Sequence, residues 1–189
     1  IHHCASGATP RRNRPEFFGG NIPWISSGEL NYNVITDTVE KITHEAVVET
    51  NLTVIPPGTF LMAITGLEAE GTRGACGVTG IAATTNQSCM AVHPTKQLLT
   101  DYLFHYYVFH GKALALQYCQ GTKQQSYTAA LVRKLPIKIP PTLDEQTAIA
   151  VVLSDMDVEL TSHEARLAKT RELKQGMMQE LLTGRTRLV

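Results

Sequence analysis

The stretch that decides the fold is residues 144–182, which read DEQTAIAVVLSDMDVELTSHEARLAKTRELKQGMMQELL. It contains no proline, and its single glycine is Gly176. Leu153, Leu160 and Leu167 recur every seven residues, and Lys174 and Leu181 extend the row. A second row follows three residues after members of the first, which predicts a heptad seam on one long helix. The seam consists of Leu153, Met156, Leu160, His163, Leu167, Thr170, Met177 and Leu181. A helix of about 39 residues would be about 58 Å long, too long for a small domain to cover.

The charges along this predicted helix are segregated. Residues 144–164 hold six acidic side chains and no Lys or Arg, a net charge of −6. Residues 165–189 hold six basic and two acidic side chains, a net charge of +4. A parallel partner of the same sequence would place like charges together, whereas an antiparallel partner pairs acid with base. The pattern therefore favours an antiparallel coiled coil. The alternative is an amphipathic helix that folds back on its own domain.

Residues 1–143 have a different character, that of a mixed, strand-rich domain. Short apolar runs recur at 22–25, 47–48, 52–55, 60–64 and 88–92. Pro56-Pro57-Gly58 indicates a turn, and the apolar spacing of residues 96–118 predicts a helix. Residues 135–139, followed by Pro140-Pro141, indicate an edge strand and a rigid joint. We therefore predict an α+β fold, with a strand-rich domain over residues 1–143 and a coiled-coil-forming helical segment over residues 144–189.

The composition is that of a globular protein, with 43% hydrophobic and 18% charged residues in 189. The formal net charge is zero, so a nucleic-acid ligand would need a local basic patch. No apolar run approaches the roughly 20 residues that cross a bilayer, and no signal peptide is visible. A cytoplasmic protein with no membrane partner is expected. Cys4, Cys76, Cys89 and Cys119 lack CxxC or metal-ligand spacing and are expected to be buried or free thiols.

Signatures of catalysis are missing from the sequence. The glycine-rich residues 66–80 match neither a phosphate-binding P-loop nor a dinucleotide fingerprint, and no nucleophile elbow or methyltransferase motif is present. His105 and His110 are five residues apart, so they do not share one helical face. We expect no catalytic residue, no metal site and no cofactor, and we expect that the chain is not an enzyme.

Two polar loops are suited to contact DNA. The first, residues 9–14, contains three arginines, and the guanidinium group matches both phosphate oxygens and guanine edges. The second, residues 121–127, offers a lysine, two amides and hydroxyls, and a glutamine can address adenine through two hydrogen bonds. Arg73 and Lys96 mark an alternative DNA face. Such loops are also common on ordinary protein surfaces. The candidate DNA-binding residues are Arg11, Arg12, Arg14, Arg73, Lys123, Gln124, Gln125, Ser126 and Tyr127.

Several segments, in order along nearly the whole chain, resemble the specificity subunits of Type I restriction–modification systems. Those that resemble the target-recognition domain are SGATP (6–10), GNIPWISSGEL (20–30), PGTFLM (57–62), TNQ (85–87) and GTKQQ (121–125). Those that resemble the start and the end of the family's conserved helix are PP (140–141), EQ (145–146), IA (149–150) and LKQGMMQELLTG (173–184).

The resemblance implies a role and a set of partners. Members of the family carry two target-recognition domains, each of which reads one half of a bipartite double-stranded DNA site, and two long antiparallel helices space them apart. Methyltransferase (modification) and restriction subunits supply methyl transfer, ATP use and cleavage. With one domain and one helix, this chain is expected to be either one half of a longer subunit or a half-length subunit that forms an antiparallel homodimer. The alternative function is a coiled-coil scaffold whose globular domain binds a protein or a ligand.

Overall fold

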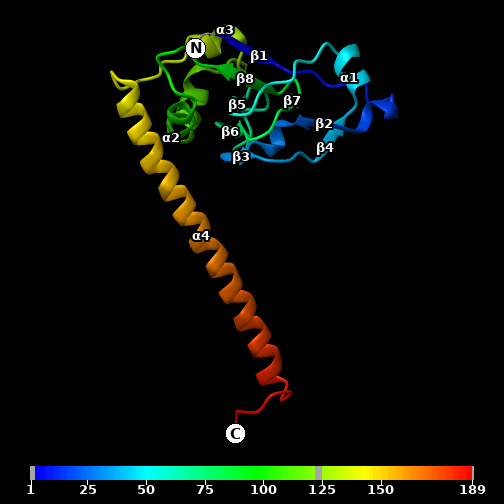
Figure 1. Cartoon of the computed structure of the whole chain (residues 1–189), viewed down its shortest axis with the longest axis vertical. Helices are drawn as coiled ribbons and strands as arrows, with labels where there is room; N and C mark the ends of the chain where they lie inside the picture. The colour runs from blue at the N-terminus through cyan, green and yellow to red at the C-terminus, as the bar shows by residue number, and fades with distance from the viewer. Residues whose placement is uncertain (1–2, 122–124, 189) are drawn as a thin grey trace. The chain divides into compact units, whose positions relative to one another are not determined.

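The computed structural model describes residues 3–121 and 125–188, and the chain divides into an N-terminal unit, residues 1–147, and a C-terminal unit, residues 148–189. Figure 1 follows the chain from β1 in blue to the end of α4 in red. The described strands are β1 (His3–Ser6), β2 (Phe18–Ile25), β3 (Asn33–Ile35), β4 (Glu40–Ile42), β5 (Phe60–Ala63), β6 (Cys76–Thr79), β7 (Thr84–Thr85) and β8 (Cys89–His93). The described helices are η1 (Pro15–Phe17), η2 (Ser27–Glu29), α1 (His44–Glu49), α2 (Thr100–Tyr118), α3 (Ala129–Arg133) and α4 (Leu143–Leu182).

The larger of the two sheets in the described residues has the strand order β1-β8-β5-β6-β3. Its neighbours are antiparallel, except that β3 and β6 run parallel. All four residues of β5, the central strand, are buried. They pack against α2, which lies beside β5 and β6 (Figure 1), and the rings of Phe60 and Tyr107 meet edge to face with centroids 5.5 Å apart. Burial of these apolar surfaces supplies the main hydrophobic core.

The smaller sheet has the order β4-β2-β7 and a core of its own. This core consists of Phe17, Trp24, Ile42 and Ala46, which are all buried. Ala46 belongs to α1, whose first turn is capped by the Thr43 hydroxyl accepting a hydrogen bond from the Ala46 N–H at 3.3 Å. Residues 47–48, one of the short apolar runs of the sequence, belong to this helix and not to a strand.

The segment between α3 and α4 is irregular, so the predicted edge strand at residues 135–139 is wrong. Two tyrosines of α2 hold the segment instead. The Tyr102 hydroxyl donates a hydrogen bond to the Lys138 carbonyl at 2.9 Å, and the Tyr106 hydroxyl donates one to the Pro136 carbonyl at 3.3 Å. Pro136 lacks the N–H that a ladder strand would donate, and the tyrosines satisfy carbonyls that a neighbouring strand would otherwise bind.

A buried glutamine joins the first turn of α4 to the start of α2. Gln146 is 1% exposed. Its side-chain oxygen accepts a hydrogen bond from the Leu99 N–H at 3.0 Å, and its side-chain nitrogen donates to the Gln97 carbonyl at 2.8 Å. Leu99 is the N-cap residue of α2 and has no capping side chain, so Gln146 satisfies backbone groups that the α2 sequence leaves without a partner.

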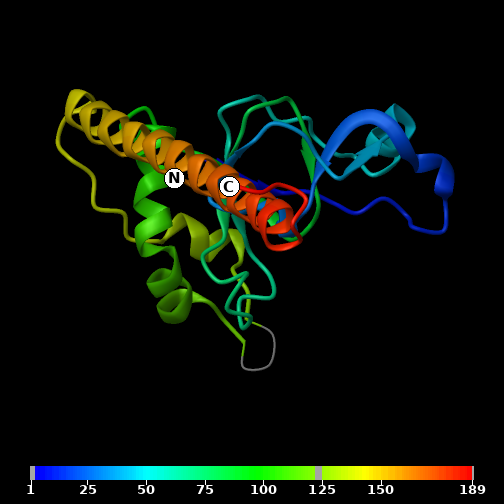
Figure 2. The same cartoon turned by 90° about the horizontal axis from the view of Figure 1, so that it is seen from below.

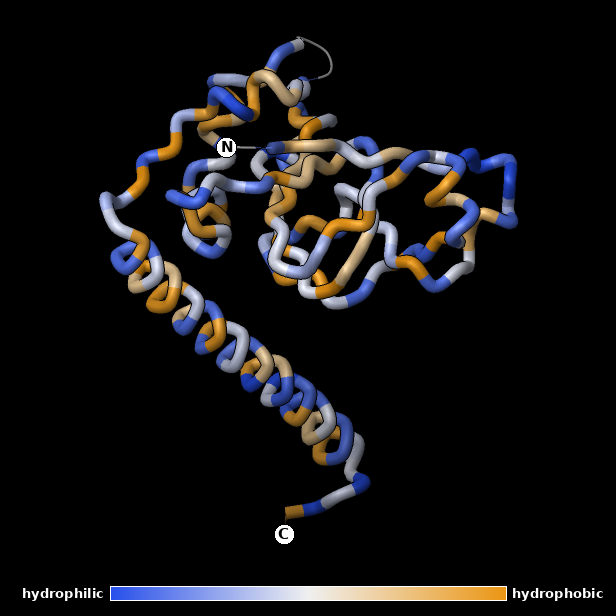
Figure 3. The backbone as a smooth tube through the Cα atoms, turned by 45° about the horizontal axis from the view of Figure 1, so that its top comes forward, coloured by the Kyte–Doolittle hydropathy of each residue, from blue (hydrophilic) through white to orange (hydrophobic). Residues whose placement is uncertain are grey.

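Helix α4 is 40 residues long, which corresponds to about 60 Å. Apolar positions recur along its length between polar ones (Figure 3). No helix among the described residues combines the length and apolar character of a membrane span. The helix ends before Gly184, whose φ of 74° is the left-handed conformation of a helix stop. The predicted α+β fold class, a strand-rich domain followed by one long helix, is confirmed.

Candidate nucleic-acid interface

The arginine loop, residues 9–14, connects β1 to η1 at the edge of the smaller sheet. A turn closes it, in which the Arg14 N–H donates to the Arg11 carbonyl at 3.0 Å. Its beginning is tied down by the Thr9 hydroxyl, which donates to the Gln87 side-chain oxygen. The three arginine side chains extend from this one turn, and each lies in different surroundings.

Arg12 is paired with a glutamate of β4. Its two terminal nitrogens donate to both carboxylate oxygens of Glu40, at 2.5 and 2.7 Å. Its guanidinium also lies over two aromatic rings, 4.6 Å from the centroid of Phe18 and 5.2 Å from that of Trp24. The hydrogen bond from Arg12 holds the pKa of Glu40 below its ordinary value. Arg12 therefore links the loop to the sheet through a bidentate charge-assisted contact.

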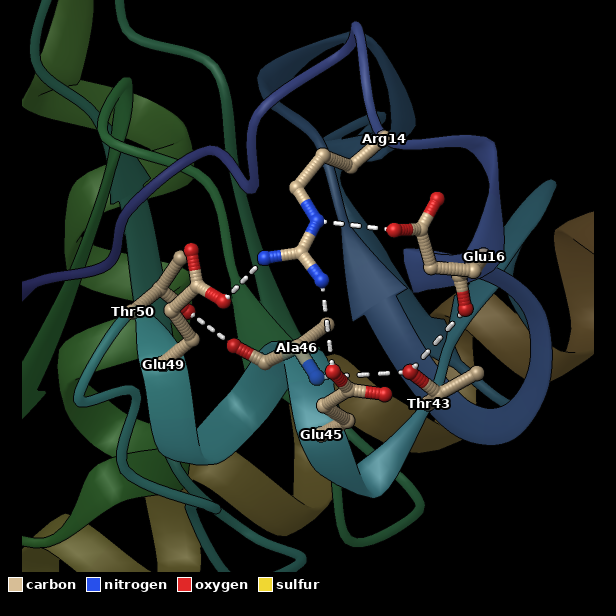
Figure 4. Close-up of polar contacts among 7 residues, drawn as sticks. All are labelled: Arg14, Glu16, Thr43, Glu45, Ala46, Glu49 and Thr50. Atoms are coloured by element: carbon tan, nitrogen blue, oxygen red, sulfur yellow. Dashed lines mark hydrogen bonds and ion pairs between the residues drawn. The ribbon is translucent and has the colours of Figure 1, made fainter.

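Arg14 lies among three carboxylates, as Figure 4 shows. Its Nε donates to Glu16 at 2.8 Å, and its terminal nitrogens reach Glu49 at 2.7 Å and Glu45 at 3.4 Å. The guanidinium lies over the Phe17 ring, 4.3 Å from its centroid. Arg14 lowers the pKa of Glu16, chiefly through their hydrogen bond. The geometry joins the loop to α1, which carries two of the three glutamates.

These contacts change the electrostatic interpretation of the arginine loop. Three arginines contribute +3, and the four glutamates that pair with Arg12 and Arg14 contribute −4, so the cluster carries a net charge of −1. Arg11 is exposed and has no ion pair among residues 3–121 and 125–188. It is the arginine of this loop whose guanidinium is available to a phosphate without first leaving a carboxylate.

The second candidate loop is described at its two ends, residues 120–121 and 125–126, which we call the hairpin. Gln120 and Ser126 pair across it through two backbone hydrogen bonds of 2.9 Å. Lys123 and Gln124 lie outside the described residues. Gln125 and Ser126 are partly exposed, although the Gln125 side-chain oxygen is buried and has no hydrogen-bond partner among the described residues.

Tyr127 is a core residue, with 3% of its surface exposed. Burial raises the pKa of its hydroxyl. A side chain buried to this degree would have to leave the core to touch DNA, because its exposed area is too small for a contact. Tyr127 is therefore removed from the candidate DNA-binding residues.

The alternative DNA face receives little support from its arginine. Arg73 is partly exposed and uses its guanidinium locally: its Nε donates to the Leu67 carbonyl at 2.8 Å, and a terminal nitrogen donates to the Glu68 carbonyl at 2.9 Å. Lys96 is exposed and precedes α2.

Glu68, whose carbonyl Arg73 binds, also contacts the hairpin: its carboxylate accepts a hydrogen bond from the Gln125 N–H. Sequence reasoning missed Glu68, because nothing in the residues around it indicates that this segment meets the hairpin.

Metal-ligand groups and thiols are two kinds of site considered in the sequence, and the structure describes both. The described residues contain no group of three or more His, Cys, Asp or Glu side chains placed to hold a metal ion. All four cysteines are free, and only Cys119 is not buried. Burial raises the pKa of Cys76 to about 12 and raises that of Cys89 as well. These two thiols are held in their protonated, weakly nucleophilic form.

The predicted seam of α4 lies on a surface-exposed helix. Leu153, Met156, Leu160, Leu167 and Met177 are between 38% and 59% exposed, and Leu181 is partly buried. The two polar members bond within the helix. His163 lies 3.6 Å from Glu159, and the Thr170 hydroxyl donates to the Arg166 carbonyl at 2.9 Å. An apolar row of this length in water is typical of a surface that a partner covers.

Comparison with known proteins gives consistent matches. Residues 1–170 match the sequence model described as the Type I restriction modification DNA specificity domain. The MjaIX specificity subunit of Methanocaldococcus jannaschii, a Type I restriction enzyme component, is 32% identical over 83% of this chain and 36% of its own length. The EcoR124I/EcoR124II specificity subunit of Escherichia coli is 27% identical over 89% of this chain and 42% of its own length.

A solved structure agrees on the fold. A chain from a type I R-M system superposes with a TM-score of 0.65 at 17% identity, over 94% of this chain and 42% of that one. The chain thus spans about two fifths of the length of the relatives that it matches. On the match over residues 1–170, this chain belongs to the Type I restriction modification DNA specificity domain family.

Proposed function

We propose that this chain reads DNA sequence within a Type I restriction–modification complex. Its N-terminal unit would contact one half of a bipartite double-stranded site, and α4 would pair with a second helix of the same kind. The family match supports this role, because it extends over the N-terminal unit and much of α4. Because the proposed ligand is DNA, we expect the chain to act in the cytoplasm.

The proposed partners are the subunits that carry out the chemistry. Methyl transfer would belong to the modification subunit and cleavage to the restriction subunit, and the present chain would be non-catalytic. The match to the specificity domain family and to specificity subunits supports this division of labour. The chain would determine where the other subunits act.

The proposed pairing of α4 is antiparallel, either with a second copy of the chain or with the sister helix of a longer subunit. Charge supports the antiparallel direction, because the acidic first half of one helix would face the basic second half of the other. Two half-sites one turn of B-DNA apart are about 34–36 Å from each other. A helix pair of about 60 Å is long enough to set that separation.

Selection from a library of randomised DNA duplexes tests the proposal. The full chain, mixed with its modification subunit, should enrich a short fixed sequence, whereas the chain alone should transfer no methyl group to any duplex. Enrichment measured by sequencing the bound fraction is the readout. If the mixture enriches no sequence, the chain is the coiled-coil scaffold instead, and methyl transfer by the chain alone would contradict its non-catalytic role.

The arginine loop yields a prediction that separates binding from folding. Arg11→Ala should weaken binding to all duplexes alike and reduce the slope of log affinity against log salt by about 1, because one phosphate contact is lost. Arg14→Ala should chiefly lower the midpoint of thermal unfolding, because it leaves Glu16, Glu45 and Glu49 facing one another. Arg14→Lys is the control, since a lysine keeps the charge but lacks the fork that bridges several carboxylates. Equal loss of affinity in Arg11→Ala and Arg14→Ala, with unchanged stability, would restore the sequence-based interpretation of this loop.

A further inference from the structure

A loop from the middle of the sequence lies beside the hairpin (Figure 2). We call residues 64–75 the supporting loop. It follows β5 and leads to β6, whereas the hairpin follows α2 roughly 50 residues later. The two segments meet in the N-terminal unit through backbone and side-chain contacts.

The supporting loop is itself firmly held. Leu67 is fully buried. Gly74 has a φ of +78°, and a Cβ atom there would lie 2.7 Å from the backbone nitrogen of Lys112 in α2, so only glycine allows this close approach. Arg73 binds the carbonyls of Leu67 and Glu68 from within the loop. The loop is thus held by the buried Leu67, by the close approach of Gly74 to α2 and by the hydrogen bonds of Arg73. It therefore offers the hairpin a surface of defined conformation.

Three hydrogen bonds attach the hairpin and the residue after it to this surface. The Leu67 N–H donates to the Gln125 carbonyl at 3.1 Å, and the Tyr127 N–H donates to the Ile64 carbonyl at 2.9 Å. The third uses a side chain: the Glu68 carboxylate accepts from the Gln125 N–H at 2.9 Å. Glu68 is exposed, and hydrogen bonds from its own N–H and that of Gln125 lower its pKa, so the carboxylate is ionised at neutral pH. Both backbone groups of Gln125 are thus fixed by the supporting loop.

We infer that Glu68, oriented by Arg73, is a positioning residue for DNA sequence reading, which acts by fixing the backbone of Gln125. The inference rests on the proposed function. The side-chain oxygen of Gln125 is buried, so a base contact from this residue would use its amide NH2 group or follow a rotation of the side chain. In either case the side chain has to start from a defined backbone position. A carboxylate beside a DNA-binding surface repels phosphates, so Glu68 lowers affinity through its charge while it sets geometry through its hydrogen bond. These two effects can be separated by substitution.

Three variants of the full chain, each assayed with the modification subunit on the randomised duplex library, separate them. Glu68→Ala removes both charge and hydrogen bond, whereas Glu68→Gln removes only the charge, since its amide oxygen can still accept from the Gln125 N–H. Glu70→Ala is the matched control. It removes another exposed carboxylate of the same loop, which pairs with Lys112 at 3.0 Å rather than with the hairpin.

All three variants should bind DNA in general more tightly than the unmodified chain, because each removes a negative charge. Only Glu68→Ala should lose discrimination, by about tenfold or more between the preferred half-site and its single-base variants at the positions that the hairpin reads. Thermal unfolding of the three variants, measured in parallel, reports on folding. Unchanged preference in Glu68→Ala, or equal loss in Glu68→Gln or Glu70→Ala, would overturn the inference while the proposed function stands. Absence of any preference in the unmodified chain would overturn both.

Discussion

Replacing Leu160 and Leu167 together by Asp is expected to convert a dimer of this chain into a monomer. Both side chains lie in the predicted seam of α4, where they are 59% and 49% exposed. In an antiparallel pair they would insert into the facing helix, and four buried, uncompensated carboxylates per dimer would abolish the association. Multi-angle light scattering of the variant and of the unmodified chain at micromolar concentration measures the change in mass.

Val158→Asp is the matched control for this experiment. Val158 is also an exposed apolar residue of α4, at 70%, but it lies on the opposite side of the helix from Leu160. The control should remain a dimer, which separates loss of the seam from a general effect of added charge. A monomeric unmodified chain would rule out the homodimer and leave the sister helix of a longer subunit as the proposed partner.

The second large effect is expected from Gln146→Leu. Leucine fills a similar volume, but it leaves the Leu99 N–H and the Gln97 carbonyl without their partner. A buried group left without a partner costs about 1–3 kcal/mol. Because Gln97 is exposed and water can partly satisfy its carbonyl, the N-terminal unit should lose about 2–4 kcal/mol of its free energy of unfolding. The midpoint of thermal unfolding should fall by about 5–15 °C. Urea denaturation followed by circular dichroism gives the free energy directly.

Glu145→Leu controls for the same turn of α4. Glu145 is exposed, and a leucine there breaks no hydrogen bond to α2. The free energy of unfolding of the Glu145→Leu variant should remain within about 0.5 kcal/mol of that of the unmodified chain. If Gln146→Leu proves equally neutral, the contact between the first turn of α4 and the start of α2 contributes nothing to stability.

The long helix could be predicted because the sequence features that specify it lie within one continuous stretch. A seven-residue spacing and the absence of proline are properties of one continuous stretch, and the observed bounds of α4, Leu143–Leu182, differ by one residue from the predicted start. The helix predicted at 96–118 likewise corresponds to α2, and the apolar run at 88–92 corresponds to β8. Only the first four residues of the predicted helix are not helical, since they precede the Thr100 start of α2.

The ion pairing of the arginine loop could not be predicted in full, because three of its four glutamate partners are distant in sequence and only Glu16 is near. Glu40 follows Arg12 by 28 residues, and Glu49 follows Arg14 by 35. Composition shows three cations within four positions, whereas the fold adds carboxylates from β4 and α1. The same reason accounts for Tyr127, which belongs to the main core together with residues of β5, β6 and α2 that lie far from it in the chain.

The contact between the supporting loop and the hairpin has a consequence for how new specificities arise in such chains. The residues that would face the bases and the residues that hold them in place are encoded roughly 50 codons apart. Recombination that exchanges the hairpin alone would separate it from Glu68 and Arg73 and leave it on a foreign support. A crossover after Tyr127, in the segment that precedes α4, transfers both together. On the proposed function, a working specificity would therefore be inherited with the whole N-terminal domain.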